Sequence, residues 1–357
     1  MAVGVLFVLA GCGYKDIDKR FFVVSIGVDK AVKEELAYTV ILKLAVPQAN
    51  IKSGAEEFIL VKEQTNSITE AIRIAKAKVD KELDFSHAKL IVFGKEVAKG
   101  DMRETIDFFT RRRDIQGIAW VGVADPTAEE VLALKPKSER LPSNSLFLSF
   151  GDTGTVSPYI ITEYMFSFRK RLYERGLDPI LPIIRVDGSN LFAIDHSAVF
   201  DKKRMQLVLS PKETALYSVL SGRANRADIK IKRENGGEFF LAMDESHTSI
   251  KLKRGAEGWM RIAIDMEVEG VVEEVKGSLP ANELGEARKE AEETLQKEAL
   301  NLLLKLQKHG LDPFGIGLRY RGSHIGRSDW DDWTTHYPDA AFDVRVDVII
   351  QTTGGLH

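Results

Sequence analysis

The sequence predicts an α+β protein: an N-terminal mixed α/β layer domain followed by a C-terminal antiparallel sheet covered by one long helix. In the first part, apolar strand-like runs alternate with amphipathic helical stretches, which favours α/β layers. In the last third, apolar and polar residues alternate over several segments, which is typical of half-buried strands. With 44% hydrophobic residues in a chain of 357, there is enough apolar surface to build more than one core.

The N-terminal elements follow from local patterns. The expected strands, each apolar and rich in β-branched or aromatic residues, cover residues 21–28, 36–45, 57–64 and 117–124. Residues 84–94 are expected to form a turn that leads into a further buried strand. A helix begins at Ser67, with Glu70 at the spacing of a capping box, and a second helix covers roughly 96–110. Thr127 caps a third, short helix. This alternation predicts the mixed α/β layers.

The middle of the chain is less regular. We expect loops at 141–144 and 151–158, a helix near 163–175 and an extended stretch at 178–182, where each proline disfavours the α region for the residue before it. A domain boundary is expected near residues 190–201.

The last third gives the clearest pattern. Strands are expected at 228–232, 249–253, 260–268 and 342–350. Their apolar face needs a cover, and the helix expected from about Ala281 to His309 supplies one. Asn282 can cap this helix, acidic residues fill its first turns, and Gly310 ends it.

These patterns predict four segments. Residues 1–11 are a signal peptide, 12–20 a lipidated cysteine and spacer, 21–195 an N-terminal domain and 196–357 the C-terminal sheet-plus-helix domain. A further division of the N-terminal domain near 130–150 is left open.

The segment Leu9–Cys12 predicts a lipid anchor. It follows an apolar run, ends in the single cysteine of the chain, and has the order apolar, small, small, cysteine of a bacterial lipoprotein signal. Cleavage before Cys12 and lipidation of its thiol would tether the mature protein to a membrane. Met1–Gly11 contains no Lys or Arg, whereas secretory signals begin with positive charge. A cytosolic protein whose first strand carries a buried Cys12 is therefore the alternative.

Composition and motifs exclude several function classes. A net charge of −3 gives no electrostatic footprint for nucleic acid, and one cysteine allows no internal disulfide or cysteine-based metal site. The seven histidines show no zinc-binding spacing, and Gly151–Thr155 lacks the lysine of a phosphate loop. We therefore predict no catalytic residue, no cofactor and no metal. A glycosidase-like pair of carboxylates stays open at this point, because with 53 Asp and Glu residues almost any spacing occurs by chance.

We interpret His87 and the pair Trp330 and Trp333 as structural residues. His87, at the mouth of an expected strand, is expected to make a structural hydrogen bond. Trp330 and Trp333 lie three residues apart and could bind a ring or a partner. We favour the alternative that they close the end of the C-terminal sheet.

Several segments together resemble the Ger(x)C spore germination lipoproteins, the C subunits of nutrient germinant receptors. The segments, from the lipobox to the C-terminus, are Gly11-Cys12, Val24–Asp29, Ser86–Gly94, Asp178-Pro179 with Leu181-Pro182, Ala198–Phe200 leading to Leu207 and Pro211–Glu213, Asp312–Gly315, Trp330, and Pro338–Ala340 ahead of Val344–Ile350. They occur in family order over essentially the whole chain.

The resemblance implies a lipid anchor at Cys12 and residence on the outer face of the spore inner membrane. It implies assembly with two integral-membrane subunits, one of them transporter-like, and a non-catalytic part in nutrient-triggered germination. Direct binding of the nutrient is left open. The alternatives from the residues alone are a lipid-anchored solute-binding protein, with two α/β lobes around a polar cleft, and a surface hydrolase.

Overall fold

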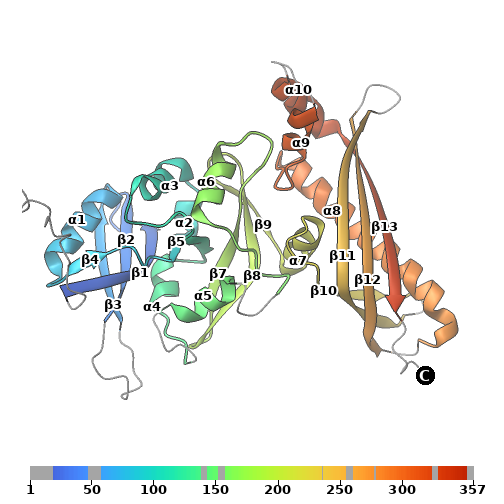
Figure 1. Ribbon diagram of the computed structural model, residues 1–357, viewed down its shortest axis with the longest axis horizontal. Helices are drawn as coiled ribbons and strands as arrows, with labels where there is room; N and C mark the ends of the chain where they lie inside the picture. Colours follow the sequence, from blue (N-terminus) through green and yellow to red (C-terminus); the bar gives the residue numbers. More distant parts are fainter. Residues whose placement is uncertain are drawn as a thin grey trace, which may run out of the picture.

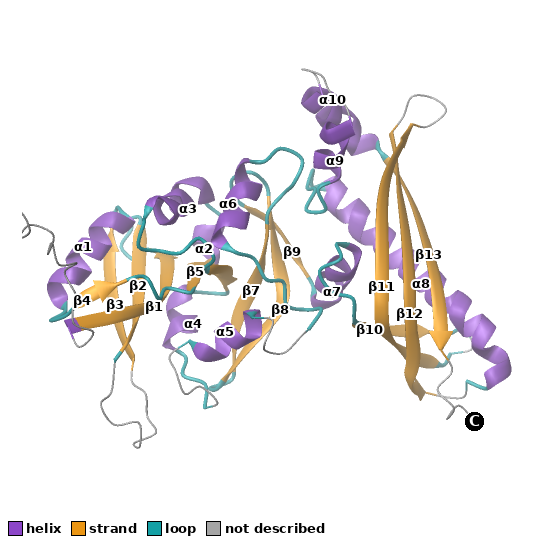
Figure 2. Ribbon diagram, viewed as in Figure 1, coloured by secondary structure: helices purple, strands orange, loops and turns teal. Residues whose placement is uncertain are grey.

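The computed structural model describes residues 19–46, 58–137, 143–151, 157–234, 236–254, 260–276, 279–323 and 329–351. Within these ranges the chain builds two sheets at opposite ends of an elongated molecule (Figure 1). The fold class is therefore mixed α+β, as predicted. The strands and helices of the first sheet occupy the N-terminal end, and the long helix with the second sheet occupies the other (Figure 2).

The first sheet has nine described strands in the order β3-β2-β1-β5-β6-β7-β8-β9, with β4 beside β1. The bounds are β1 Arg20–Lys30, β2 Tyr38–Ala45, β3 Phe58–Thr65, β4 Glu82–Asp84, β5 Leu90–Gly94, β6 Trp120–Ala124, β7 Ile180–Asp187, β8 Leu191–Phe200 and β9 Met205–Leu209. Strands β1, β5, β6 and β7 run parallel in the centre. Central parallel strands are covered on both faces, and β5 accordingly is buried along its whole length.

Helices cover both faces of this sheet. Helices α1 (Ile68–Lys78), α3 (Met102–Arg111) and α6 (Met165–Tyr173) pack into one hydrophobic core, and α4 (Ala128–Ala133) with α5 (Asn144–Phe150) into another. Figure 1 shows these two groups on opposite sides of the sheet. Thr127 caps α4 as predicted, through its hydroxyl, which accepts from the Glu130 amide.

Three local predictions need correction. The expected helix at 96–110 is two helices, α2 (Lys95–Ala98) and α3, because Asp101 accepts a hydrogen bond from the Arg103 amide and starts a new helix. The Ser67 side chain makes no capping hydrogen bond to α1. Asn144, expected in a loop, begins α5.

The second sheet has the order β10-β11-β12-β13, with strands Ala227–Lys232, Glu238–Arg254, Met260–Lys276 and Ala341–Gln351. Helix α8 (Leu284–Lys308) buries its apolar stripe on one face, as predicted. Its expected cap at Asn282 is wrong, because Ala281–Glu283 form a 3-10 turn and Glu283 stands at the N-cap without a side-chain hydrogen bond. One detail of the expected topology is wrong: β13 runs parallel to β12, so the sheet is mixed rather than wholly antiparallel. The cause is α8, a long crossover that returns the chain to the end of the sheet where β12 began.

A helix between the sheets joins them. Helix α7 (Pro211–Leu220) is buried along most of its length and shares one core with both sheets. That core combines Ile180 and Val199 of the first sheet with the apolar faces of the second sheet and α8. The predicted boundary between residues 195 and 196 falls inside β8, and the division of the chain there remains a prediction.

Candidate functional site at the junction of the two sheets

The junction is built around two aspartates from distant parts of the chain. Asp178 precedes β7, and Asp312 follows α8. The Asp312 amide donates to the Asp178 carboxylate at 2.7 Å, and the Asp178 amide donates to the Asp312 carbonyl at 2.8 Å. Both aspartates are buried, at 8% and 3% exposure. This reciprocal pairing fixes the two loops to each other.

The Asp312 carboxylate starts the next helix. It accepts from the amide of Ile316 at 3.0 Å and from that of Gly317 at 2.7 Å, at the beginning of α9 (Ile316–Ser323). Burial and the nearby Asp178 charge raise the pKa of Asp312 to about 7, although the backbone amides oppose the shift. Removing a charge from water disfavours the ionised form, so this carboxyl titrates near neutrality.

A lysine neutralises the other aspartate. The Lys202 ammonium lies 2.8 Å from the Asp178 carboxylate and donates to the carbonyls of Arg171 and Leu177 at 2.8 and 2.7 Å. All three donors of an ammonium group are thereby used. The Lys202 ammonium is therefore fully occupied by contacts within the protein and is not available to bind a ligand.

Two glycines let the backbones approach. Gly176 has φ +80°, and a Cβ there would lie 2.4 Å from the Gly317 carbonyl carbon. A Cβ on Gly317 would in turn lie 2.7 Å from the ring of Trp333. The Leu318 amide donates to the Gly176 carbonyl at 2.8 Å. The contact therefore requires glycine on both sides.

A second buried charge extends the junction toward α7. Glu163 is 4% exposed; it pairs with Arg223 at 2.8 Å and with Arg171 at 3.6 Å. Burial of Arg223 opposes its charge, but its interactions with Tyr217 and with the Glu163 carboxylate outweigh that and raise its pKa. Arg171 also donates to the carbonyls of Asp178 and Pro313. The carboxylates of Asp178, Asp312 and Glu163 are therefore all engaged by protein groups. Because their partners come from both parts of the chain, these contacts couple the two sheets.

The family-like segments quoted above meet in pairs. Asp178 and Asp312 are one pair. In the other, Asp29 at the end of β1 accepts from the amides of Ala128 and Glu129 at 2.7 and 2.9 Å. A Cβ on Gly94 would lie 2.0 Å from the Asp29 carboxylate. Sequence reasoning placed these residues in motifs but had no signal for which motifs touch.

The remaining sequence candidates have structural surroundings. His87 contacts the Ser86 hydroxyl at 3.0 Å and the Phe22 ring at 4.6 Å. Trp333 is 3% exposed and stacks on Tyr337 at 4.7 Å, just before β13. The packing interpretation of Trp333 is thus confirmed. Residues 152–156 of the glycine-containing segment and Cys12 lie outside the described residues.

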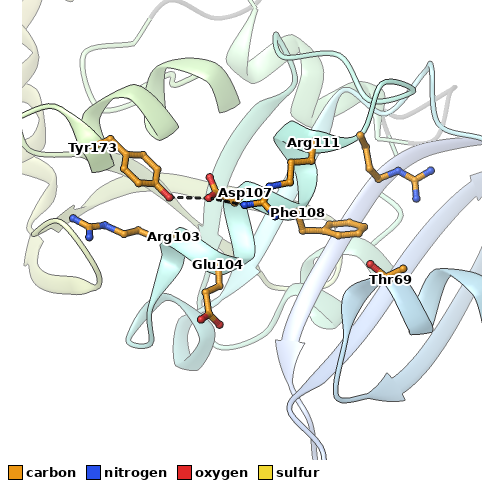
Figure 3. Close-up of a pocket in the computed structure, with 8 residues that line it drawn as sticks. Thr69, Arg103, Glu104, Asp107, Phe108, Arg111 and Tyr173 are labelled. Atoms are coloured by element: carbon orange, nitrogen blue, oxygen red, sulfur yellow. Dashed lines mark hydrogen bonds and ion pairs between the residues drawn. The ribbon is translucent and has the colours of Figure 1, made fainter.

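A cavity in the first domain has a carboxylate that is engaged by neighbouring side chains. This cavity has a volume of about 470 Å³ and lies among α1, α3 and α6. Of its two carboxylates, Asp107 receives a hydrogen bond from the Tyr173 hydroxyl at 2.8 Å (Figure 3). Arg169 also donates to Asp107, at 3.0 Å. Burial tends to raise the pKa of Asp107, but these hydrogen bonds outweigh it and lower the pKa.

Among the residues that the structure describes, no group of three His, Cys, Asp or Glu is placed to hold a metal ion. Within the same residues, no helix has the length and apolarity needed to cross a membrane. The two sheets also differ in strand order and helix cover, unlike the paired lobes expected of a solute-binding protein.

The fold and the junction define a two-sheet α+β protein whose halves are coupled through buried charges. Comparison with known proteins identifies its family. Residues 13–186 match the family described as "Spore germination protein N-terminal domain", and residues 195–354 match "Spore germination B3/ GerAC like, C-terminal". The chain belongs to this Ger(x)C family of spore germination proteins, the germinant receptor C subunits.

Individual relatives agree. The chain is 21% identical to the putative spore germination protein YfkR of Bacillus subtilis (strain 168), covering 99% of this chain and 95% of the relative. It is 22% identical to spore germination protein KC of the same organism, covering 98% and 93%. The crystal structure of the GerBC protein matches with a TM-score of 0.62 at 14% identity, over 92% of this chain and 97% of that one. That likeness supports the fold.

Proposed function

We propose that this chain is a lipid-anchored, non-catalytic subunit of a spore nutrient germinant receptor. In this proposal it sits on the outer face of the spore inner membrane and assembles there with two integral-membrane subunits, one of them transporter-like. The observation that carries the proposal is the match of both halves of the chain, in order, to the germination family. The lipobox at Leu9–Cys12 supplies the anchor.

The anchor acts by raising local concentration. A diacylated cysteine carries two acyl chains, which suffice for stable membrane attachment. Confinement to the membrane surface lets weak contacts with membrane subunits assemble the receptor. Coupling of the two sheets through the Asp178–Asp312 and Glu163–Arg223 contacts fits a subunit that acts through rigid surfaces.

Lipidation is tested by the intact mass of the membrane fraction, with the chain expressed from its native upstream sequence. We expect the mass of a chain that begins at Cys12 and carries a diacylglyceryl group. A soluble protein that retains Met1 would contradict the anchor.

The receptor role is tested in spores whose only copy carries Cys12→Ala. The variant is expected to fold, because Cys12 precedes every described element, but to be soluble and to impair nutrient-triggered germination. Germination in response to a non-nutrient trigger serves as the control. Normal nutrient germination of these spores would contradict the proposed role of the anchor.

A further inference from the structure

We infer that the edge of the first sheet at which β1, β5 and β6 begin is a lipid-contacting surface, where an aromatic ladder with two exposed and two half-buried rings meets the head-group region of an anionic bilayer. The aromatic ladder consists of Phe147, Trp120, Tyr164 and Phe166. The inference rests on the proposed anchor at Cys12 for its geometry and extends it: the folded domain itself, beyond the lipid, touches the membrane.

The ladder is continuous although its residues come from three segments. Ring centroids are 6.2 Å apart for Trp120 and Phe147, 6.0 Å for Trp120 and Tyr164, and 5.8 Å for Tyr164 and Phe166. Phe166 is 53% exposed, and Ile118, two residues before β6, is 61% exposed. A cluster of large exposed apolar side chains marks an interaction surface.

The backbone holds the ladder rigidly. The Met165 amide donates to the Ala119 carbonyl at 2.8 Å, and the Phe166 amide donates to the Gly117 carbonyl at 3.1 Å. The Val121 amide donates to the Glu163 carbonyl at 2.9 Å. Because the side chains are held on paired backbone segments, little further order is needed for binding, and pre-organisation lowers its entropic cost.

The ladder lies on the edge from which the anchor leaves. The parallel strands β1, β5 and β6 all begin at this edge, and the Lys89 amide donates to the Val24 carbonyl while the Trp120 amide donates to the Lys89 carbonyl. The loops along the edge touch as well, since the Gln116 side chain donates to the Ser86 carbonyl at 3.1 Å. The edge therefore forms one rim from β1 to the ladder.

The anchor is close enough to bring this rim to a bilayer. Cys12 precedes Arg20, the first residue of β1, by eight positions. Eight extended residues reach about 28 Å at most. A lipid on Cys12 would therefore hold the start of β1 within that distance of the membrane surface. The rim lies further along the strand, because Leu90 and Trp120 are level with Ser25, five positions after Arg20.

Charge around the ladder favours an anionic surface. The Lys89 ammonium lies 5.7 Å from the Phe147 ring centroid. Lys170 is exposed one helical turn after Phe166. Trp and Tyr favour the membrane interface, and each cation near anionic head groups adds about 1 kcal/mol of attraction. This combination favours lipid over a purely apolar protein partner.

The test uses the chain from residue 12 onward with Cys12→Ser, so that no acyl chain contributes. This chain keeps every described element, because those begin at residue 19, and therefore keeps all three cores. Its binding to vesicles containing phosphatidylglycerol, and to zwitterionic vesicles, is measured by sedimentation. Emission from Trp120 is followed on vesicle addition, with Trp120→Phe assigning the signal among the four tryptophans.

The patch variant is Ile118→Ser with Phe166→Ser. The matched control is Leu304→Ser with Ile349→Ser, two apolar residues of the C-terminal domain that are 44% and 55% exposed. From the apolar area involved, we expect the patch variant to lower the partition coefficient for anionic vesicles by about tenfold or more. The control variant is expected to change the partition coefficient by less than about twofold. On vesicle addition, the Trp120 emission is expected to shift to shorter wavelength in the unsubstituted chain and in the control variant, but not in the patch variant.

Several outcomes would overturn the inference. Absence of vesicle binding would do so, as would equal losses in the patch and control variants. A patch variant that binds vesicles normally but no longer co-purifies with membrane subunits would identify the ladder as a protein interface. Because the chain in this assay carries no acyl group on residue 12, its result is independent of the mass measurement that tests lipidation of Cys12.

Discussion

At the scale of single residues, the junction depends on groups whose environment changes their ordinary behaviour. Asp312 is the clearest case, because it is buried, accepts two helix amides and lies beside a second carboxylate. Gly176 and Gly317 are the other, because their backbones touch where any side chain would collide. Both cases give predictions that separate a specific contact from a general effect of mutation.

Substitution of Asp312 by Asn is expected to change how stability depends on pH. The pKa of Asp312 in the folded protein is about 7, against an ordinary value of 3.8 for an aspartate. Between these pH values the folded state keeps a proton that the unfolded state has lost. The contribution of Asp312 to stability is therefore full below about pH 4, declines by roughly 1 kcal/mol per pH unit up to about pH 7, and is lost above that. Asn does not titrate, so this decline is absent in the variant.

The measurement is the free energy of unfolding from urea titrations of both proteins at several pH values. The difference between wild type and Asp312→Asn should shift in favour of the variant as pH rises from about 4 to 7. Two curves that run parallel over this range would show that Asp312 is ionised throughout in the folded state.

Substitution of Gly176 by Ala tests the close backbone contact, with Gly222→Ala as a matched control. Both glycines have positive φ, +80° and +69°, but nothing lies within 4 Å of a Cβ built on Gly222. The control should lose about 1 kcal/mol, the cost of a left-handed alanine. Gly176→Ala should lose several kcal/mol, because the backbone at Gly317 must move. Equal losses in chemical denaturation would mean that the junction adapts freely.

At the scale of elements, the caps show which local patterns the fold uses. Helix α7 has a complete capping box, in which Ser210 and Glu213 exchange side-chain and backbone hydrogen bonds, and Lys305 of α8 pairs with Glu213 at 2.7 Å. Helix α1 has the same spacing at Ser67 but makes no side-chain cap. The same motif is therefore formed in one helix and unused in another.

Alanine substitution of the two serines should reveal this difference. Ser210→Ala is expected to reduce the free energy of unfolding by about 1 kcal/mol. Both hydrogen bonds of the Ser210 hydroxyl are lost, whereas the backbone amide of residue 210 still donates to the Glu213 carboxylate. Ser67→Ala is expected to change it by less than about 0.5 kcal/mol, as for a surface substitution that breaks no contact. Thermal and urea unfolding of both variants measures the difference. A larger loss for Ser67→Ala would contradict the capping geometry.

At the scale of the whole molecule, the two sheets share one core. Residues of β7, β8 and β9 pack with α7, the second sheet and α8 in a single cluster. The buried Glu163, paired with Arg223 and Arg171, adds a charged tie across the same junction. The two family-matched halves of the chain are thus packed together through a shared hydrophobic core in the described structure.

We therefore expect a single cooperative unfolding transition for the whole chain. Calorimetric and van't Hoff enthalpies should agree, because neither sheet can unfold without exposing the shared core. Glu163→Ala removes the tie and leaves two arginines without their carboxylate, so the variant is expected to melt at lower temperature. Two resolved transitions in the wild-type protein would show that the halves fold independently.

The sequence by itself determined the elements with strong periodicity and the family. Alternation along β12 and β13, and the apolar stripe of α8, are local properties of the chain, so the second sheet and its helical cover could be predicted. The ordered motifs from Val24–Asp29 to Asp312–Gly315 were enough to indicate the germination family. The lipid anchor at Cys12 lies outside the described residues and remains a prediction of the sequence.

Only the tertiary structure decided which distant segments meet. The parallel pairing of β13 with β12, the contact of Asp178 with Asp312 across 134 positions, and the stacking of Trp120 on Tyr164 leave no mark in local periodicity. A strand shows the same alternation whether its neighbour runs parallel or antiparallel. Burial that raises a pKa, and a rim that gathers exposed rings, arise only when packing brings residues from separate elements together.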